Sequence, residues 1–436
     1  MSLYSQASII IPPEPPIKTG FLSAIDILNS SIVDFTVTRA LDTATRVNQD
    51  GIIELVAANT ARIDFAEGTG VGSLLLEPTR ENTMTHSSNI SLNITSNTTT
   101  ITLNTAIAPD GTLSADKIED TSAAATQEGY YSPNTLLVGQ WQTFSLFIKK
   151  DNNESRFPEF FNRMFNGGTS EVYSVIQLNT KTGAIIERVG GGTRSYKIED
   201  YGDYWRLQIS LLDNNTGNVT YRFYIRPAFT DVFGNVANNA TTGFIEVWGL
   251  QNEVGSYATS YIPTSGSTVT RNRDAISLNG INALLGDNAG TFMVDVKWFE
   301  TLSSISLSDG TSGNRLSLYS FNNLVYIDRV GTAASVNGGE SPLNVFSKIV
   351  YSYDNSGIVV HQDGDNIITS LTSTSYPTGT LNKLSFDIGT GSSGFFYGRL
   401  KSLLVYKTAL DTEASEVLTS YHSFKEIADN KKYTIL

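Results

Sequence analysis

YRFYIRPAF, residues 221–229, alternates between two sets of side chains with a period of two. The first set is Tyr221, Phe223 and Ile225, and the second is Arg222, Tyr224 and Arg226. Successive side chains of a β-strand point to opposite faces, so this spacing predicts a strand with one face in a core. FSLFIKK (144–150) and FIEVWGLQ (244–251) are further apolar runs in the same stretch, and Gly- and Asn-rich turns separate them. The stretch 86–268 therefore predicts a β-sandwich.

A second series of strand patterns follows in 291–422. MVDVKWF (293–299) places Val294, Val296 and Trp298 on one face, and GRLKSLLVY (398–406) predicts a final strand. After it, Asp411 is placed to cap a short helix, whose buried face would carry the following residues: Val417, Leu418 and Tyr421. This series predicts a second sandwich.

Short turns of Asn, Asp and Gly separate several of these strands. Asn322-Asn323, Asn355 to Gly357, and Asp363-Gly364 each lie between apolar runs, and Asp50-Gly51 does so near the N-terminus. These residues adopt positive φ at little cost, which favours tight hairpin turns. We expect a hairpin at each position.

The fold class that these patterns predict is all-β: two jelly-roll-like β-sandwiches in tandem with an extended N-terminal segment. The expected division of the chain is as follows: an extended Pro-rich segment (1–20), a small β-hairpin collar (21–85), the first sandwich (86–268), a linker (269–290), the second sandwich (291–422) and a C-terminal tail (423–436).

The N-terminal segment combines three isoleucines with closely spaced prolines. The residues are Ile9, Ile10, Ile11, Pro12, Pro13, Pro15 and Pro16. Prolines favour extended polyproline II and exclude helix or central strand. Two interpretations are open: a peptide that anchors the chain to another protein, or a disordered tail.

Charge and composition exclude several functional classes. The formal net charge is −13, which opposes binding to the phosphates of nucleic acid. No stretch reaches the roughly 18 apolar residues that a membrane span needs. The N-terminus lacks the basic region and the apolar core of a secretory signal. The absence of cysteine removes thiol nucleophiles and cysteine-based zinc sites.

Candidate catalytic and metal-binding residues are few. Glycoside hydrolysis needs two carboxylates across a cleft, and Glu246 and Asp203 are the candidates, but no enzyme motif surrounds them. The three histidines, His86, His361 and His422, lack metal-ligand spacing. We expect a protein without catalytic residues or cofactor. Structural calcium is the alternative left open, at the oxygen-rich stretches 151–154 and 213–215.

The segment DNNESRFPEFFNRMFNGG (151–168) shows no clean alternation and reads as a long loop. Exposed aromatic rings beside Asn or Arg side chains are the usual components of a sugar-binding surface. The candidate residues for ligand binding or a subunit interface are Arg156, Phe157, Phe160, Phe161, Asn162, Arg163 and Phe165. Packing or a subunit interface is the preferred interpretation, because exposed phenylalanines on a monomer favour aggregation.

Three phrases resemble a module of tailed-bacteriophage head-spike, head-fibre and tail-fibre proteins. They are FTVTRALDTATRVNQDGIIELVAANTARIDF (35–65), GSLLLEPTREN (72–82) and VWGLQNEVGSYATSYIPTSGSTVTRNRD (247–274). Glu81 stands where that module usually has Thr, and Asn252 where it has Leu. The ending GRLKSLLVYKTALDTEASEVL (398–418) is similar, more weakly, to concanavalin A-like and laminin-G-like jelly rolls.

This resemblance implies a virion structural protein, a fibre or spike on the exterior of a phage particle. Its expected partners are capsid or tail proteins through the N-terminus and further copies of itself, in a homotrimer. It also implies a carbohydrate-binding-module-like sandwich, for which cell-surface polysaccharide is the candidate ligand. Head and tail attachment both stay open. The alternative function is a virion-borne glycan depolymerase, and a bacterial adhesin is a third, weaker reading.

Overall fold

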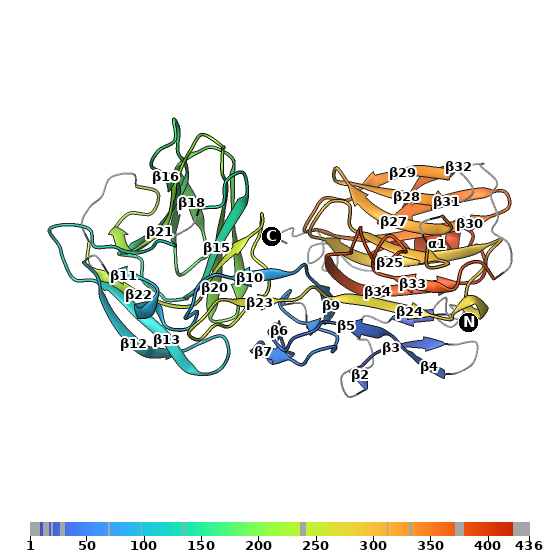
Figure 1. Ribbon diagram of the computed structural model, residues 1–436, viewed down its shortest axis with the longest axis horizontal. Helices are drawn as coiled ribbons and strands as arrows, with labels where there is room; N and C mark the ends of the chain where they lie inside the picture. Colours follow the sequence, from blue (N-terminus) through green and yellow to red (C-terminus); the bar gives the residue numbers. More distant parts are fainter. Residues whose placement is uncertain are drawn as a thin grey trace. The chain divides into compact units, whose positions relative to one another are not determined.

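The chain is almost entirely β-structure, as the alternation predicts. A computed structural model describes the following residues: 9–11, 17–18, 21–26, 31–68, 70–96, 98–133, 136–235, 241–311, 313–330, 334–370 and 379–421. The chain forms two compact units (Figure 1). Unit 1 comprises 1–41, 56–78 and 273–436, and unit 2 comprises 42–55 and 79–272.

Unit 2 is a sandwich of two six-stranded sheets among its described residues. The first sheet has the order β11 (Thr95–Ser96), β14 (Gly129–Tyr131), β21 (Thr220–Thr230), β16 (Phe157–Phe165), β17 (Val172–Leu178) and β18 (Ile185–Gly191). The second has the order β12 (Thr100–Ile107), β13 (Leu113–Asp120), β22 (Gly243–Val254), β15 (Trp141–Lys149), β20 (Tyr204–Leu212) and β19 (Arg194–Tyr201).

The core of unit 2 is formed by the inward side chains of both sheets. Phe144 of β15 stacks on Phe223 of β21, with 3.7 Å between the ring centroids. Tyr221, Phe223 and Ile225 are fully buried in this core, which confirms the alternation of 221–229. The short 3-10 helix η2 (Ile90–Leu92) contributes Ile90 to the same core.

Unit 1 is also a sandwich. Its larger sheet follows the path β2 (Ile17–Lys18), β3 (Phe21–Asp26), β1 (Ile9–Ile11), β34 (Gly398–Tyr406), β25 (Gly290–Trp298), β30 (Phe346–Asp354), β31 (Gly357–Gln362) and β32 (Asp365–Ser370), with β4 (Ser31–Asp34), β8 (Ile63–Asp64) and β9 (Ser73–Leu76) attached. Its smaller sheet has the order β29 (Ala334–Glu340), β28 (Leu324–Val330), β27 (Arg315–Phe321), β26 (Ser304–Ser308), β33 (Lys383–Ser385), β24 (Ala275–Asn279) and β5 (Thr36–Thr38). Trp298 and Ile305 meet in the core between them.

The expected hairpin turns are confirmed. Phe321 pairs with Leu324 around Asn322 and Asn323, both of which have positive φ. Asp354 pairs with Gly357, and Gln362 with Asp365. The turn at Asp50-Gly51 joins β6 (Ala44–Val47) to β7 (Ile53–Val56), and a further two-stranded sheet pairs β10 (Arg80–Asn82) with β23 (Val269–Arg271).

The C-terminal helix is present, but of the three residues predicted for its buried face only Leu418 is buried on it, because Val417 is exposed and Tyr421 lies beyond the end of the helix. Asp411 caps α1 (Thr412–Thr419) by accepting a hydrogen bond from the Ala414 N–H, at 2.8 Å. Leu418 is buried against Val350 and Leu404 of the larger sheet. Val417 is 50% exposed, because consecutive residues of a helix point about 100° apart and Leu418 takes the position that faces the sheet. In the described part of the chain, no helix has the length and apolar character that crossing a membrane requires.

The expected division of the chain into six segments stays a prediction, and the two compact units each draw on several of those segments. Residues 21–85 are shared between the units, and 269–290 contain β23, β24 and the short 3-10 helix η3 (Asn282–Leu284). Within 21–85, β3, β4, β5, β8 and β9 join the two sheets of unit 1, whereas β6 and β7 form a two-stranded sheet of their own. Ile9 to Ile11 pair with Val405 to Leu403 of β34. Pro12, Pro13, Pro15 and Pro16 lie outside the described residues, as do 423–436.

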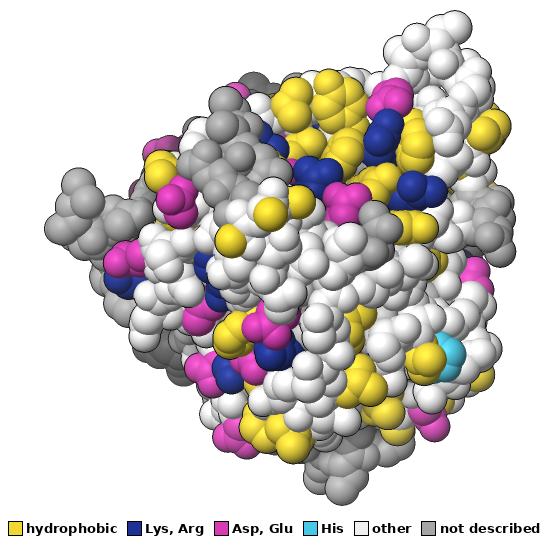
Figure 2. Space-filling model, turned by 90° about the vertical axis from the view of Figure 1, so that its left-hand side faces the viewer, with side chains coloured by type: hydrophobic (Ala, Val, Ile, Leu, Met, Phe, Trp, Pro, Cys, Tyr) yellow, Lys and Arg dark blue, Asp and Glu magenta, His cyan; other side chains and the backbone are white. Residues whose placement is uncertain are grey.

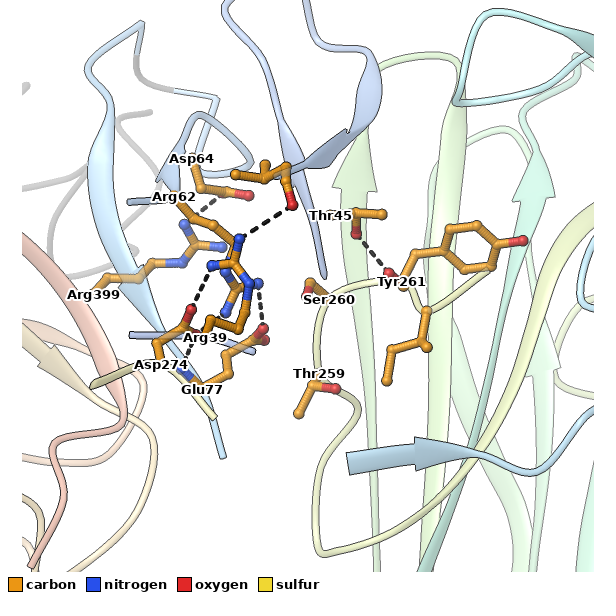
Figure 3. Close-up of polar contacts among 12 residues, drawn as sticks. Arg39, Thr45, Arg62, Asp64, Glu77, Thr259, Ser260, Tyr261, Asp274 and Arg399 are labelled. Carbon is orange, nitrogen blue, oxygen red and sulfur yellow. Dashed lines mark hydrogen bonds and ion pairs between the residues drawn. The ribbon is translucent and has the colours of Figure 1, made fainter. Parts of the chain in front are cut away.

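The phage-like phrases supply a buried ion cluster of unit 1, formed by Arg39, Arg62, Glu77 and Asp274 (Figure 3). Asp274 accepts hydrogen bonds from Arg39 at 2.9 Å, from Arg62, and from the Glu77 N–H at 3.0 Å. Burial alone would lower the pKa of Arg62, but Asp274 and Glu77 raise it above its ordinary value. These charged residues therefore have a structural role.

Other polar residues of the second and third phrases hold unit 2 together. The Asn82 amide donates to the carbonyls of Leu250, at 3.3 Å, and Ile262, at 2.9 Å. Glu253 accepts a hydrogen bond from the Thr259 N–H at 3.0 Å. The described contacts of these residues are thus within the fold.

Candidate functional site

The Phe-rich segment is a strand, and its interpretation as a long loop was wrong. Phe157 to Phe165 form β16, which lies between β21 and β17 inside the first sheet of unit 2. A register shift between Phe157 and Glu159 accommodates Pro158, since a proline cannot donate to a sheet ladder. The alternation was hidden because large side chains occupy both faces of the strand.

The structure separates the seven predicted residues into three groups. Phe160 and Asn162 are fully buried and face the core side of the sheet. Arg156 and Phe157 begin the strand, where Arg156 pairs with Asp151 and Phe157 packs on Phe233. The residues on the outer face are Phe161, Arg163 and Phe165. No single site can therefore contain all seven.

The outer face of this sheet carries a row of aromatic rings across three strands. Tyr130 of β14 is directly opposite Tyr224 of β21, and Tyr224 is directly opposite Phe161 of β16. The ring centroids of Phe161 and Tyr224 are 5.3 Å apart with 20° between the planes. Those of Tyr130 and Tyr224 are 5.7 Å apart. Tyr173 of β17 meets the edge of Phe161 at 6.3 Å. We call this set the aromatic face.

Arginine side chains lie among these rings, and three of them form ion pairs. Arg163 of β16 pairs with Glu171 at 2.8 Å. Arg226 of β21 pairs with Glu128 at 2.8 Å and with Glu159, and Arg188 of β18 also pairs with Glu159. Burial would lower the pKa of Arg226, but Glu159 and Glu128 raise it above its ordinary value.

Arg222 of β21 has a different environment. Its guanidinium carbon lies 4.4 Å from the centroid of the Tyr130 ring and 5.4 Å from that of Phe165. Its Nη1 donates to the Tyr224 hydroxyl at 3.1 Å. Nε is buried without a hydrogen-bond partner among the described residues, and no described carboxylate pairs with this side chain. Arg222 is therefore a cation held by aromatic rings.

The aromatic face has the chemistry of a ligand-binding surface. Tyr130, Phe161, Tyr173 and Arg222 are each partly exposed, so their rings and donors reach solvent. Figure 2, which faces the strands of unit 2, shows hydrophobic side chains directly beside basic and acidic ones. Flat rings flanked by fixed hydrogen-bond donors can hold a molecule that has both an apolar face and polar edges.

The other sequence-predicted candidates do not form a comparable site. Glu246 pairs with Lys149 at 3.3 Å, and Asp203 is exposed in a turn. Burial is the main cause that raises the pKa of Tyr204 above its ordinary value. The negative charges of Glu246 and Asp203 raise it further, so both carboxylates lie near its phenol. The non-enzymatic character of the chain stays a prediction.

The predicted metal positions have protein partners. The Asp151 carboxylate accepts from Arg156 and from the Thr180 hydroxyl, the latter at 2.7 Å. Asp213 Oδ2 accepts from the Gly139 N–H at 2.8 Å. Among the described positions, no three acidic or histidine side chains are grouped to hold a metal ion. Structural calcium stays a prediction.

The histidines form no common site among the described residues, because His86 belongs to unit 2 and His361 to unit 1. His86 Nδ1 lies 3.0 Å from the Thr85 hydroxyl, in an isolated bridge to Ser265. His361 is buried in β31, and His422 lies outside the described residues. They show no shared function.

Sequence reasoning missed the aromatic face because it treated the two central strands separately. The alternation in 221–229 already placed Arg222, Tyr224 and Arg226 on the face opposite the core. Only the register of β16 against β21 shows that Tyr224 meets Phe161 and that Arg222 meets Arg163. Tyr130 and Tyr173, on the flanking strands, gave no sequence signal of their own.

Comparisons with known proteins leave the function open. No family model matches this chain. No curated protein matches it either. Among solved structures, it is similar to the carbohydrate-binding module CBM40 of Ruminococcus gnavus IT-sialidase bound to α2,3-sialyllactose. The match has 18% sequence identity and a TM-score of 0.27, and it covers 31% of this chain and 84% of that chain.

Two further solved structures share more of the chain at lower identity. Trypanosoma rangeli sialidase in complex with sialic acid matches at 10% identity, over 70% of this chain and 60% of that chain, with a TM-score of 0.24. Mouse laminin α1 domains LG4-5 match at 10% identity, over 67% of this chain and 91% of that chain, with a TM-score of 0.21. At these TM-scores none of them assigns a function to this chain.

Proposed function

We propose that this chain is a non-enzymatic glycan-binding protein, and that the aromatic face of unit 2 holds the glycan. The observation that carries the proposal is a row of rings that crosses three neighbouring strands beside Arg222. Tyr130 and Phe161 are its partly exposed members, and the buried Tyr224 lies between them. Sugar rings have apolar faces and hydroxyl edges. Aromatic rings can stack on those faces, and arginine side chains can donate to the hydroxyls.

The dimensions of the row suit an extended ligand. Neighbouring strands are about 4.8 Å apart, so the row covers two strand spacings, roughly 10 Å. The rings are held by contacts with one another and by strands that are hydrogen-bonded on both sides. A surface that is ordered before binding loses little conformational entropy when the ligand arrives.

We further propose that the protein belongs to the exterior of a phage particle, as a head or tail fibre or spike. The three phage-like phrases support this placement. Several copies, in a homotrimer, would present several aromatic faces, and multivalency strengthens weak sugar sites. The N-terminal segment is proposed to contact capsid or tail proteins.

Glycan binding is tested with the purified full-length protein on an array of neutral and acidic glycans. We expect binding by the wild type and a loss of at least tenfold in the Tyr130→Ala variant, whose ring lies on the outer face. The matched control is Phe321→Ala, which removes a partly exposed aromatic ring in unit 1 and should leave binding unchanged. Equal binding by all three proteins would rule out the aromatic face.

The same preparation tests the alternative of a depolymerase. Each bound glycan is incubated with the protein, and new reducing ends are measured. The non-enzymatic proposal expects none, and sustained release that is abolished in Glu246→Gln would replace it by the depolymerase.

The proposed location is tested by immunogold labelling of particles, which should decorate the outside of the head or the tail.

A further inference from the structure

We infer that the glycan bound by the aromatic face is acidic, and that Arg222 binds its carboxylate. This inference rests on the proposed function and specifies the substrate class of the same surface.

The carboxylates on this face are already used by other arginines. Glu171 pairs with Arg163, Glu128 with Arg226, and Glu159 with both Arg226 and Arg188. Arg222 has no carboxylate partner in the described part of the chain. It is directly opposite Arg163 in the strand register, so the two residues form a matched pair: one guanidinium is neutralised and the other is not.

The position of Arg222 is fixed although it lacks a counter-ion. Its guanidinium contacts three rings, those of Tyr130, Phe165 and Tyr224, with centroid distances of 4.4, 5.4 and 5.7 Å. Its hydrogen bond to the Tyr224 hydroxyl, at 3.1 Å, restricts the rotation of the fork further. An anion would therefore meet a preorganised planar donor. Such a donor favours bidentate binding of a carboxylate.

The aromatic row places the ligand beside this donor. Tyr130 and Tyr224 both belong to the row and both contact Arg222. The Tyr224 ring is buried, whereas the Tyr130 ring is partly exposed. A sugar ring that lies on Tyr130 would bring a carboxylate at its edge within reach of the guanidinium. A neutral sugar would gain the stacking but would leave the charge unpaired. Charge complementarity thus selects acidic sugars, although the whole chain has a net charge of −13.

The experiment uses three carboxylated polymers as probes: polygalacturonate, hyaluronan and polysialic acid, each compared with its methyl ester. Esterification removes the charge and keeps the sugar backbone. We expect the full-length protein to bind at least one carboxylated polymer, and to bind its ester at least tenfold more weakly. Arg222→Gln should lower affinity for the acid form by a similar factor, and Arg222→Lys should restore part of it.

The matched control removes the neighbouring ion pair. The double variant Arg163→Gln and Glu171→Gln leaves the net charge of the chain unchanged and retains Arg222, so it should keep the preference for acid over ester. Thermal melting checks that each variant folds. If Arg222→Gln does not fold, the comparison of acid with ester on the wild type decides whether the glycan is acidic. Arg222→Lys, which keeps the charge but loses the planar donor, then tests the residue, because unchanged affinity for the acid form would contradict its role.

The possible failures are distinguishable. If esters and neutral glycans bind as tightly as the acid forms, the inference about Arg222 is wrong while the proposed glycan binding stands. If Arg222→Gln folds and keeps full preference for the acid form, another cation is responsible and the assignment of Arg222 fails. If neither these probes nor any glycan on the array binds, the proposed function itself fails.

Discussion

Phe161 and Tyr224 stack across neighbouring strands, with 5.3 Å between the ring centroids and 20° between the ring planes. The residue before Phe161, Phe160, points the other way, into the core, where it is fully buried. Two adjacent phenylalanines of β16 thus belong to different environments. One contributes to the fold and the other to the aromatic face.

Substitution of these two residues should have separate effects. Phe160→Ser should destabilise unit 2 by about 3–5 kcal/mol, because it removes a buried ring and leaves a cavity. Phe161→Ser should cost about 0.5–1.5 kcal/mol, the value of a lost aromatic pair, and should weaken glycan binding. Urea unfolding followed by tryptophan fluorescence measures both. Equal destabilisation by the two variants would contradict the opposite orientation of their side chains.

Asp274 should be essential to unit 1. Asp274→Ala leaves Arg39 and Arg62 without the carboxylate that both of them contact, and both guanidinium groups are buried. Leaving a buried charge uncompensated typically costs about 3–5 kcal/mol, and thermal unfolding should show this loss. The control is Glu171→Ala, which breaks the partly exposed pair with Arg163 and should cost at most about 1 kcal/mol. A small effect of Asp274→Ala would show that the ion cluster is dispensable.

Mild acid should destabilise unit 1 through His361. This side chain is fully buried opposite Val350, and neither ring nitrogen has a hydrogen-bond partner among the described residues. Burial lowers the pKa of His361 below its ordinary value of 6.5, and Glu416 of α1 opposes this shift. The unfolded chain therefore takes up a proton at a pH at which the folded form is still neutral.

The sign of the effect follows directly. The stability associated with a neutral His361 is complete above about pH 6.5 and decreases as the pH falls toward the lower pKa of the folded state. Melting temperatures between pH 8 and pH 5 should fall more steeply in the wild type than in His361→Leu, which cannot titrate. Parallel pH profiles for the two proteins would exclude His361 as the titrating group.

Leu302 should be a site where glycine stabilises the protein. Its φ is 61°, a left-handed conformation in which the Cβ of an L-residue is crowded, and its side chain is 57% exposed. Leu302→Gly should therefore gain up to about 1 kcal/mol, because relief of the left-handed conformation, worth about 1–2 kcal/mol, exceeds the added entropy of glycine in the unfolded chain. Leu302→Ala keeps the Cβ and serves as the control. A gain from alanine as large as that from glycine, measured by urea unfolding, would point to another cause.

Local sequence patterns predicted much of the secondary structure. The hairpin at Asn322-Asn323 was predictable because both residues accept positive φ, and the cap at Asp411 because its carboxylate can bond to the first turn of a helix. The strand β16 was not predicted, because Phe161 and Phe165 on its outer face are as apolar as Phe160 inside. A period-two pattern is visible only when the two faces differ in polarity.

The sequence by itself determined that this chain is an all-β protein with two sandwiches, because alternation and turn chemistry are local properties. Only the tertiary structure decided which strands are neighbours. Thr36 pairs with Ser277, and Leu74 pairs with Leu400, although they are distant in the chain. A strand's own pattern tells which face is buried, but it does not tell which edge the strand will meet. For the same reason, the sequence contained Arg222 but could not show that the neighbouring strands bring it aromatic rings and, among the described residues, no carboxylate.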